Sequence, residues 1–325
     1  MIQTKKTCWR LLLVASSSIA FSVSNQLAGI AAQEFDISLQ LNRYPKNVQN
    51  WQWLDFFRQL YVKNNLERVT PCSTPRIPLI IHHIWLGSKL PQPYAQLRKS
   101  WFTYNPDWTF VFWTDDPVNY DQGILVTAEQ LQQELLHAQP GKRFVVDVST
   151  FSFENKHFYD TAKNYGERSD LLRYDVMNTF GGLYADTDCE CFKPFNLLHQ
   201  CYDFYAGLHP LDTSYLQVAT ALFGTVPHHP IMEACVKTIK NTRHIIPIVL
   251  KTGPLYFTRI FYAIASQQDK KSTEVRTVIF PPTYFYPCDY NQRGAPQKEW
   301  LRPESFSVHH WEGSWLKAPV RKVSS

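Results

Sequence analysis

The sequence predicts an α/β fold, a sandwich with a largely parallel sheet. Short apolar runs alternate along the chain with segments of helical periodicity, which is the pattern of α/β proteins. The first run, Leu79–Leu86, is apolar except for His82 and His83, and it ends at Gly87. Near-continuous apolar runs of this kind are typical of parallel strands that are buried on both faces. The chain has 325 residues, 44% of them hydrophobic, which is enough for a sizeable core.

The other expected elements follow in order along the chain. Strands are predicted at Trp108–Trp113, Arg143–Val148, Leu183–Asp186, Phe204–Leu208, Val218–Gly224 and Val278–Phe280. Helices are predicted at Pro93–Tyr104, Arg168–Phe180, Pro230–Asn241 and Pro254–Ala265. The order of the strands in the sheet does not follow from this pattern.

Residues 1–32 have the features of a targeting segment. Lys5, Lys6 and Arg10 precede the apolar run Leu11–Val23, and small residues follow it. This arrangement is typical of an export signal, and the run is shorter than the ~20 apolar residues of a membrane-spanning helix. We expect a cleaved signal peptide first and an uncleaved membrane anchor second. The protein is therefore expected to be exported or membrane-anchored, in the cell envelope or the secretory pathway.

The rest of the chain divides into three predicted parts. Residues 33–76 form a helical appendage and linker, because apolar residues between Trp53 and Tyr61 recur at helical spacing and Thr70–Pro75 then breaks any helix. Residues 77–318 form the main domain, and residues 319–325 form a tail.

Charge and cysteine content exclude some classes of protein. The net charge is +5 and contains no block of five like charges, so a nucleic-acid-binding tail is not expected. Six cysteines remain beyond Cys8, an even number that is compatible with disulfides in an oxidising compartment. Cys189 and Cys191 lack the spacing of a structural zinc site. The disulfide state stays open.

The segment from Asp170 to Asp188 carries the strongest chemical signal. Asp170 and Arg173 are three residues apart and share one face of a predicted helix. Gly181-Gly182 can end that helix in a left-handed turn. On an extended chain, Tyr184, Asp186 and Asp188 then point to one side. Two carboxylates are thus expected at the carboxyl end of a strand, where open α/β sheets bind ligands.

A divalent cation is the natural partner of two adjacent carboxylates, because the two charges otherwise repel each other. Oxygen ligands suit Mg²⁺ or Mn²⁺, which keep open positions for phosphate oxygens. An isolated Asp-x-Asp is common on solvated turns and would not carry this interpretation. The acid and arginine upstream and the Gly-Gly stop make the combined pattern specific.

These motifs resemble glycosyltransferase family 32, the yeast α-1,6-mannosyltransferase-like group with a DXD sugar-binding motif, which is related to the clostridial glucosylating toxins. The resemblance spans about residues 77–316. It rests on Ile77–Gly87, Trp101, Asn105–Trp108, Phe112–Asp115, Asp170–Asp188 and His309–Trp315.

The resemblance implies a GT-A type (Rossmann-like) fold, a UDP- or GDP-sugar donor, Mn²⁺ (or Mg²⁺) and retention of anomeric configuration. The acceptor would be a glycan, a lipid or a protein. Carried over by position, Trp85 would stack on the base, Asp170 and Arg173 would bind the sugar, and Tyr184 would line the donor pocket. Arg173 would also lie near the diphosphate, and Ser314 and Trp315 would contact the phosphates. Asp186 would contact donor and metal, Asp188 would bind the metal, and His309 would lie near it, with His310 as second choice. The resemblance thus implies Asp186, Asp188 and Arg173 as the catalytic residues.

Two other functions are alternatives to the glycosyltransferase. Haloacid-dehalogenase-type phosphohydrolases also use Asp-x-Asp, but a Thr or Val typically stands where this chain has Glu190, and their motif lies on the first strand. A non-catalytic carbohydrate-binding protein on the same fold is the other alternative, and the intact Asp170 and Arg173 disfavour it. Release of a nucleoside diphosphate from a sugar nucleotide distinguishes a transferase from a lectin.

Overall fold

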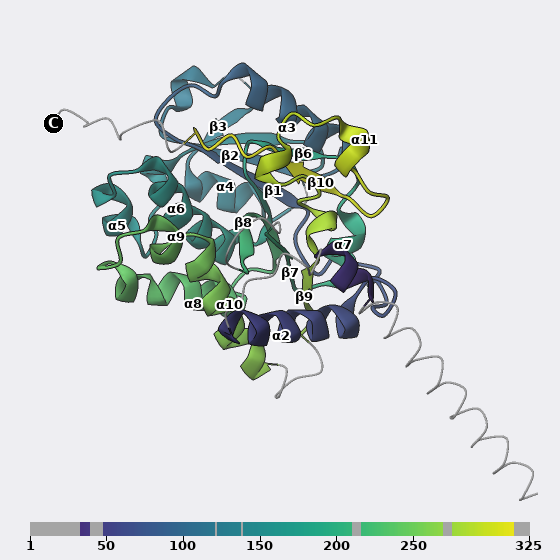
Figure 1. Ribbon diagram of the computed structural model, residues 1–325. Helices are drawn as coiled ribbons and strands as arrows, with labels where there is room; N and C mark the ends of the chain where they lie inside the picture. Colours follow the sequence, from purple (N-terminus) through teal and green to yellow (C-terminus); the bar gives the residue numbers. More distant parts are fainter. Residues whose placement is uncertain are drawn as a thin grey trace, which may run out of the picture.

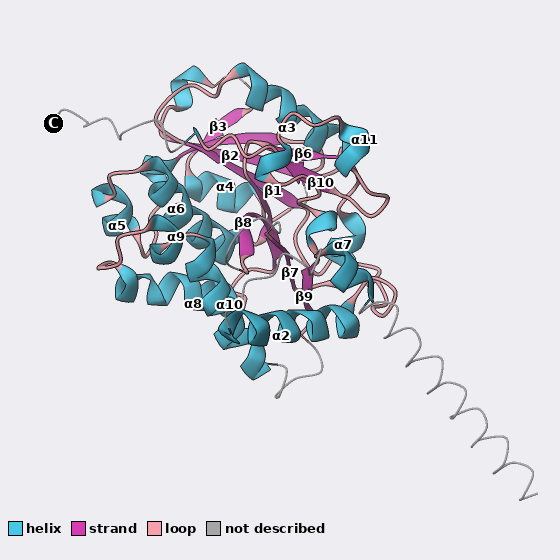
Figure 2. Cartoon of the chain, in the orientation of Figure 1, coloured by secondary structure: helices cyan, strands magenta, loops and turns pink. Residues whose placement is uncertain are grey.

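A single eight-stranded sheet forms the centre of the computed structural model, which describes residues 33–39, 48–120, 122–137, 139–209, 216–268 and 275–314 (Figures 1 and 2). In spatial order the strands are β3 (Ile124–Val126), β4 (Arg143–Asp147), β2 (Thr109–Thr114), β1 (Ile80–Trp85), β5 (Gly182–Ala185), β8 (Val218–Thr225), β7 (Phe204–Leu208) and β9 (Thr277–Phe280).

The sheet is largely parallel, as predicted. Only β8 runs against its neighbours: it pairs antiparallel with β5 on one side and with β7 on the other. The remaining pairs, from β3 through β5 and between β7 and β9, are parallel. The strands β1, β2, β7, β8 and β9 are almost entirely buried, which explains their near-continuous apolar sequences. The predicted α/β class is confirmed.

Helices surround this sheet. They are α2 (Val48–Asn64), α3 (Gln92–Tyr104), α4 (Ala128–Glu134), α5 (Lys156–Thr161), α6 (Tyr165–Phe180), α7 (Asn196–Cys201), α8 (Pro230–Thr238), α9 (Ile248–Lys251), α10 (Pro254–Gln268) and α11 (Gln297–Trp300), with 3₁₀ turns at Pro117–Asn119, Val148–Thr150, Ile239–Thr242, Pro282–Tyr284 and Tyr290–Gln292. In Figure 1, α5, α6, α8 and α9 gather to the left of the sheet, and α3, α7 and α11 lie to its right.

A small second sheet joins the C-terminal part of the described chain to the middle of the sequence. Strand β10 (Ser307–His309) pairs antiparallel with β6 (Cys189–Cys191), so that His309 lies opposite Cys189. Both strands have only three residues, too few for period-2 alternation to predict them. This pairing brings the predicted C-terminal motif beside Asp188.

Helix α2 packs on the main sheet within the same hydrophobic core. The Asn64 side-chain amide donates to the Thr277 carbonyl (2.8 Å), and the Tyr202 hydroxyl donates to the Asn64 carbonyl (2.6 Å). The predicted linker is fixed as well, because Arg76 forms a two-pronged ion pair with Asp203, both contacts 2.8 Å long. The division at residue 76 stays a prediction, but the appendage is not a detached module.

Several predicted boundaries are wrong by a few residues. Helix α6 begins at Tyr165 rather than Arg168, because the Asn164 side chain caps it by accepting from the amides of Gly166 and Glu167. Helix α8 ends at Thr238 and continues only as a 3₁₀ turn. The cysteines of the described residues are all free.

The predicted targeting segment and tail lie outside the described residues. Within the part of the chain that is described, no helix is both long and apolar enough to cross a bilayer.

Candidate functional site

The turn from α6 into β5 places the candidate site at the centre of the sheet. Gly181 caps the helix with φ 61°, and Gly182 follows with φ 96°. Both values lie in the region that only glycine adopts easily. The approach is also close, since a Cβ on Gly182 would lie 2.6 Å from the Ile80 carbonyl oxygen. The predicted glycine stop is therefore confirmed, but Gly181, with ψ −156°, lies outside the left-handed helical region that was expected. The stop lets β5 pair directly with β1.

The two acids of the Asp-x-Asp motif lie on a turn at the end of β5. The strand ends at Ala185, and the Cys189 amide donates back to the Asp186 carbonyl at 3.0 Å. The Asp186 amide donates to the Ala221 carbonyl of β8 at 2.8 Å, which fixes the turn to the sheet. The prediction that the extended chain continues through Asp188 is wrong, because the turn intervenes. Both carboxylates nevertheless lie at the predicted carboxyl end of β5.

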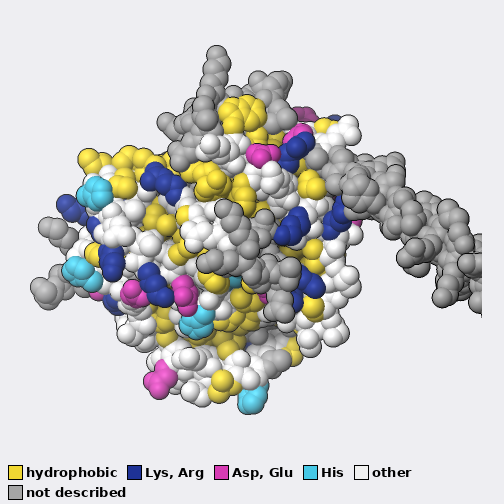
Figure 3. All heavy atoms as spheres, turned by 90° about the horizontal axis from the view of Figure 1, so that it is seen from below, with side chains coloured by type: hydrophobic (Ala, Val, Ile, Leu, Met, Phe, Trp, Pro, Cys, Tyr) yellow, Lys and Arg dark blue, Asp and Glu magenta, His cyan; other side chains and the backbone are white. Residues whose placement is uncertain are grey.

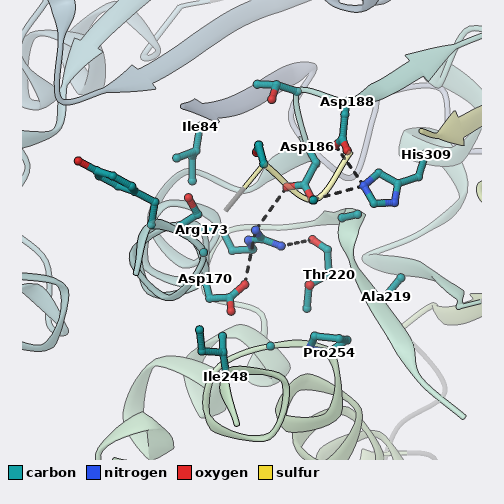
Figure 4. A pocket seen from close by; sticks show the side chains of 18 of the residues that line it. Ile84, Asp170, Arg173, Asp186, Asp188, Ala219, Thr220, Ile248, Pro254 and His309 are labelled. Carbon is teal, nitrogen blue, oxygen red and sulfur yellow. Dashed lines mark hydrogen bonds and ion pairs between the residues drawn. The ribbon is translucent and has the colours of Figure 1, made fainter. Parts of the chain in front are cut away.

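Arg173 connects the acid on α6 to the first acid of the motif (Figure 4). Its Nη2 lies 3.5 Å from an Asp170 oxygen and 3.3 Å from Asp186 Oδ1. Its Nη1 donates to the Thr220 carbonyl at 2.7 Å, and the guanidinium lies 4.6 Å from the ring centre of Tyr184. The Tyr184 hydroxyl in turn donates to Asp186 Oδ1 at 2.6 Å. Burial alone would lower the pKa of Arg173, but these neighbours raise it, so the cation persists.

The second acid is paired with the C-terminal motif. His309 Nε2 lies 3.1 Å from Asp188 Oδ1 and 4.0 Å from Asp186 Oδ2. The Glu312 amide donates to Asp188 Oδ2 at 3.0 Å. His310 points elsewhere and contacts Glu190 at 3.0 Å. Of the two histidines, His309 is therefore the one beside both acids.

Burial and charge give the three acids different proton affinities. Burial raises the pKa of Asp170 to about 6, although Arg173 and a hydroxyl from Thr252 oppose that change. Burial also raises the pKa of Asp186, and the nearby Asp188 charge adds to this. Burial would raise the pKa of Asp188 too, but His309 and the Glu312 amide hold it at about 2. The contact with Asp188 raises the pKa of His309 despite burial.

A cavity of about 600 Å³ opens over these residues. One wall carries Asp170, Arg173, Tyr184, Asp186 and Asp188, and another carries His309 and Ser314. Trp85 lies at the end of β1 in the same cavity, with its ring 5.0 Å from that of Tyr94 and its Nε1 donating to Ser88 Oγ at 3.3 Å. The predicted site residues up to Ser314 are thus together in one pocket, whereas Trp315 lies outside the described residues.

The opposite wall carries residues that sequence reasoning did not predict. Ile248, Val249 and Pro254 line it, and in Figure 4 Ile248 and Pro254 lie across the cavity from Asp186 and Asp188. Thr252 from the same segment donates its hydroxyl to Asp170 at 2.9 Å. These residues belong to no motif, and only the fold shows that they reach the site.

The ligand set fits a divalent cation. Asp186 and Asp188 offer hard oxygen ligands and His309 an imidazole, a set that Mn²⁺ and Mg²⁺ accept. Asp188, Cys189 and His309 also place one potential ligand atom each within 4.8 Å of one another. The Nδ1 atom of His309 is buried without a hydrogen-bond partner among the described residues, so the imidazole has one nitrogen that no protein group satisfies.

The part of the chain that contains this site is similar to known proteins. Residues 91–205 match the family model described as the glycosyltransferase sugar-binding region containing the DXD motif, and Asp186 and Asp188 fall within that match. The chain is 26% identical over 245 residues to the Saccharomyces cerevisiae protein mannosyl phosphorylinositol ceramide synthase SUR1, covering 73% of this chain and 55% of that one. It is 25% identical over 186 residues to the Schizosaccharomyces pombe protein inositol phosphoceramide mannosyltransferase 2, covering 56% and 45%.

The chain spans about half the length of these curated relatives. Among solved structures, the PaToxG glycosyltransferase superposes with a TM-score of 0.47 at 18% identity, covering 69% of this chain and 83% of that one. The family match includes α6, the glycine turn and both acids of the turn after β5. Residues 91–205 of this chain are therefore similar to the glycosyltransferase sugar-binding region that contains the DXD motif.

Proposed function

We propose that this protein is a metal-dependent, retaining glycosyltransferase that moves a hexose from a UDP- or GDP-sugar to an acceptor. The observation that carries the proposal is the convergence of Asp186, Asp188, His309 and Arg173 on one pocket at the carboxyl end of β5. The names of the two yeast relatives specify mannosyl transfer and an inositol phosphoceramide lipid. Mannose and a lipid acceptor are accordingly our first choices, with glycans and proteins as alternatives.

The donor would occupy the cavity from Trp85 to the Asp170 wall. An indole at the cavity rim can stack on a nucleotide base. Arg173 and Asp170 are held rigidly, since the guanidinium contacts two carboxylates and a carbonyl. Such a preorganised pair suits the hydroxyl groups of a sugar, which need both donors and acceptors in fixed positions. Ser314 also lines the cavity, on the side of Tyr94 and Trp85, and its hydroxyl would offer a contact to a phosphate oxygen.

Asp188, Asp186 and His309 would hold the divalent cation. When bound, Mn²⁺ or Mg²⁺ supplies positive charge that stabilises the departing diphosphate. Cation binding would replace the contact between His309 and Asp188, and the low pKa of Asp188 keeps that carboxylate ionised and ready to bind. Asp186 retains its bonds to Tyr184 and Arg173, so its orientation is fixed in advance.

Retention requires the acceptor hydroxyl to attack from the side of the leaving group, or through a covalent intermediate. The carboxylates that line the cavity are Asp170, Asp186 and Asp188, and each is already bonded to a neighbour. We therefore favour a front-face reaction in which the departing diphosphate takes the acceptor proton. Trapping of a glycosyl-enzyme adduct would contradict this mechanism.

A donor screen tests the proposal. The purified protein is incubated with UDP- and GDP-sugars and Mn²⁺, and release of nucleoside diphosphate is measured with and without EDTA. We expect release from one class of donor, GDP-mannose first, and its loss on chelation. Binding of sugar nucleotides without any release would instead indicate a carbohydrate-binding protein. Release of inorganic phosphate from phosphate monoesters would indicate a phosphohydrolase.

A further inference from the structure

The segment Ile245–Leu250, next to the pocket, exposes an unusual amount of apolar surface. It consists of six successive apolar residues, Ile-Ile-Pro-Ile-Val-Leu. Ile246 has 90% of its surface exposed and Val249 has 37%. Isolated exposed apolar residues are ordinary, but a contiguous apolar segment of this kind marks an interaction surface.

This apolar segment is held in place by a buried carboxylate. Glu167 on α6 contacts Arg243 at 2.6 Å and Lys251 at 2.9 Å, one on each side of the segment. The Thr242 hydroxyl joins the two ends of the segment, because it donates to the Lys251 carbonyl at 2.7 Å. Both ends are therefore anchored to the body of the protein, and Ile246 lies exposed between them. The exposure of Ile246 is therefore built into the fold.

The charge around the apolar segment is positive. From residue 233 to residue 251 the chain contains four basic residues, Lys237, Lys240, Arg243 and Lys251, and one acidic residue, Glu233. Arg243 and Lys251 are compensated by Glu167, and Lys237 contacts Glu233 at 3.0 Å. Lys240 is exposed and has no ion pair among the described residues. Figure 3, which shows the molecule from below the view of Figure 1, has Lys and Arg side chains scattered among hydrophobic, acidic and His side chains on this face.

The apolar segment is continuous with the wall of the donor pocket. Ile248 and Val249 line the cavity, while Ile246 and Pro247 project outward from the same stretch of chain. Any surface that covers Ile246 therefore also lies against the mouth of the cavity. An exposed apolar tip on the same stretch of chain as the exposed Lys237 and Lys240 matches a bilayer interface with anionic lipids, which attracts basic side chains and accepts apolar ones.

We propose that Ile245–Leu250 docks on an anionic membrane surface and so brings the pocket mouth to a lipid acceptor. The membrane contact stands on the segment's own exposure and charge. The acceptor part rests on the proposed transferase function. Ile246 and Pro247 would enter the interface between headgroups and acyl chains, and Lys240 would remain at the level of the anionic headgroups.

Amide hydrogen exchange of the full chain tests the docking, because it reports protection for each segment separately. Membrane binding through another segment would therefore not be mistaken for docking of residues 245–250. Exchange is compared without vesicles, with phosphatidylcholine vesicles and with vesicles containing phosphatidylserine. We expect the phosphatidylserine vesicles to slow exchange within residues 244–250 by about tenfold, which corresponds to ~1.4 kcal/mol of protection. Ile246→Asn should remove this protection. Lys240→Gln should weaken it by a few-fold.

The matched control is Val118→Asn, because Val118 is a similarly exposed apolar residue (91%) outside the segment. It should keep the protection of residues 244–250. Unchanged exchange of the wild-type segment on vesicles, or equal protection in Ile246→Asn, would overturn the docking proposal.

Donor cleavage is measured on the same preparations. Ile246→Asn should release nucleoside diphosphate at the wild-type rate with a water-soluble acceptor or with water. Membrane protection without any donor cleavage would contradict the transferase function and leave docking intact. Donor cleavage without protection of residues 244–250 on vesicles would contradict the docking and leave the transferase function intact.

Discussion

Two facing walls of the donor pocket, the acid wall and the apolar wall opposite it, differ in how the chain builds them. The acid wall comes from one stretch, residues 170–188, which runs from α6 through the glycine turn to the end of β5. The opposite wall comes from residues 248–254, which begin 60 positions after residue 188, and is mainly apolar. The polar groups of the acid wall thus come from one short stretch of sequence, in which residue spacing fixes their relative positions. The fit to sugar and acceptor depends on a segment that only the tertiary structure brings near.

The largest expected effect lies on the acid wall, at the second motif acid. Asp188→Asn removes an ionised ligand of the cation while keeping the side-chain size. We expect kcat to fall about 10³-fold, since the charge on the departing diphosphate would lose its main compensation. Nucleoside diphosphate release with Mn²⁺ measures this, with far-UV circular dichroism as the check on folding.

Glu190→Gln is the matched control for Asp188→Asn. Glu190 contacts His310 at 3.0 Å, much as Asp188 contacts His309 at 3.1 Å, but it does not line the cavity. It should keep near-normal activity. Equal losses in the two variants would show that the carboxylate–histidine pairs act only in folding, and the metal assignment would be wrong.

Arg173→Lys should have the next largest effect, because Arg173 joins Asp170 to Asp186. Lysine keeps the charge but lacks the planar fork that reaches two carboxylates and the Thr220 carbonyl. We expect kcat/KM to fall about 10²-fold. Arg168→Lys serves as the control, since Arg168 on the same helix donates to the Asp160 and Ala162 carbonyls at the end of α5. A normal kcat/KM in Arg173→Lys would show that charge alone suffices.

The same difference between the walls explains how far the sequence could predict the site. The helix, the glycine stop and the acids after β5 follow from local spacing, and the structure bears out their placement. The pairing of His309 with Asp188 depends on two three-residue strands, β6 and β10, which have no periodicity to detect. Thr252, Ile248 and Pro254 belong to no sequence motif. Their positions follow from the packing of α9 and α10 beside α6, which is a tertiary property.

Thr252→Val tests whether the opposite wall controls donor binding through Asp170. The change removes the hydroxyl that donates to Asp170 at 2.9 Å but keeps the shape of the side chain. Asp170 would lose one of its two orienting contacts, so we expect KM for the donor to rise about tenfold with a smaller change in kcat. Thr252→Ser retains the hydroxyl and should behave like the wild type. A fall in kcat alone would place Thr252 in the chemical step instead.

The smallest effect on catalysis is expected at Glu167, which holds the opposite wall without touching the donor. Glu167→Gln leaves Arg243 and Lys251 without their buried counter-charge, so we expect the free energy of unfolding to fall by about 1–3 kcal/mol. KM should rise only a few-fold, because the wall loosens while Asp170, Asp186 and Asp188 keep their places. Glu233→Gln is the matched control, since its exposed pair with Lys237 is worth at most ~0.5 kcal/mol. If Glu167→Gln changed kcat as strongly as Arg173→Lys, the two walls would not be separable, and Glu167 would have to act on the acid wall through α6.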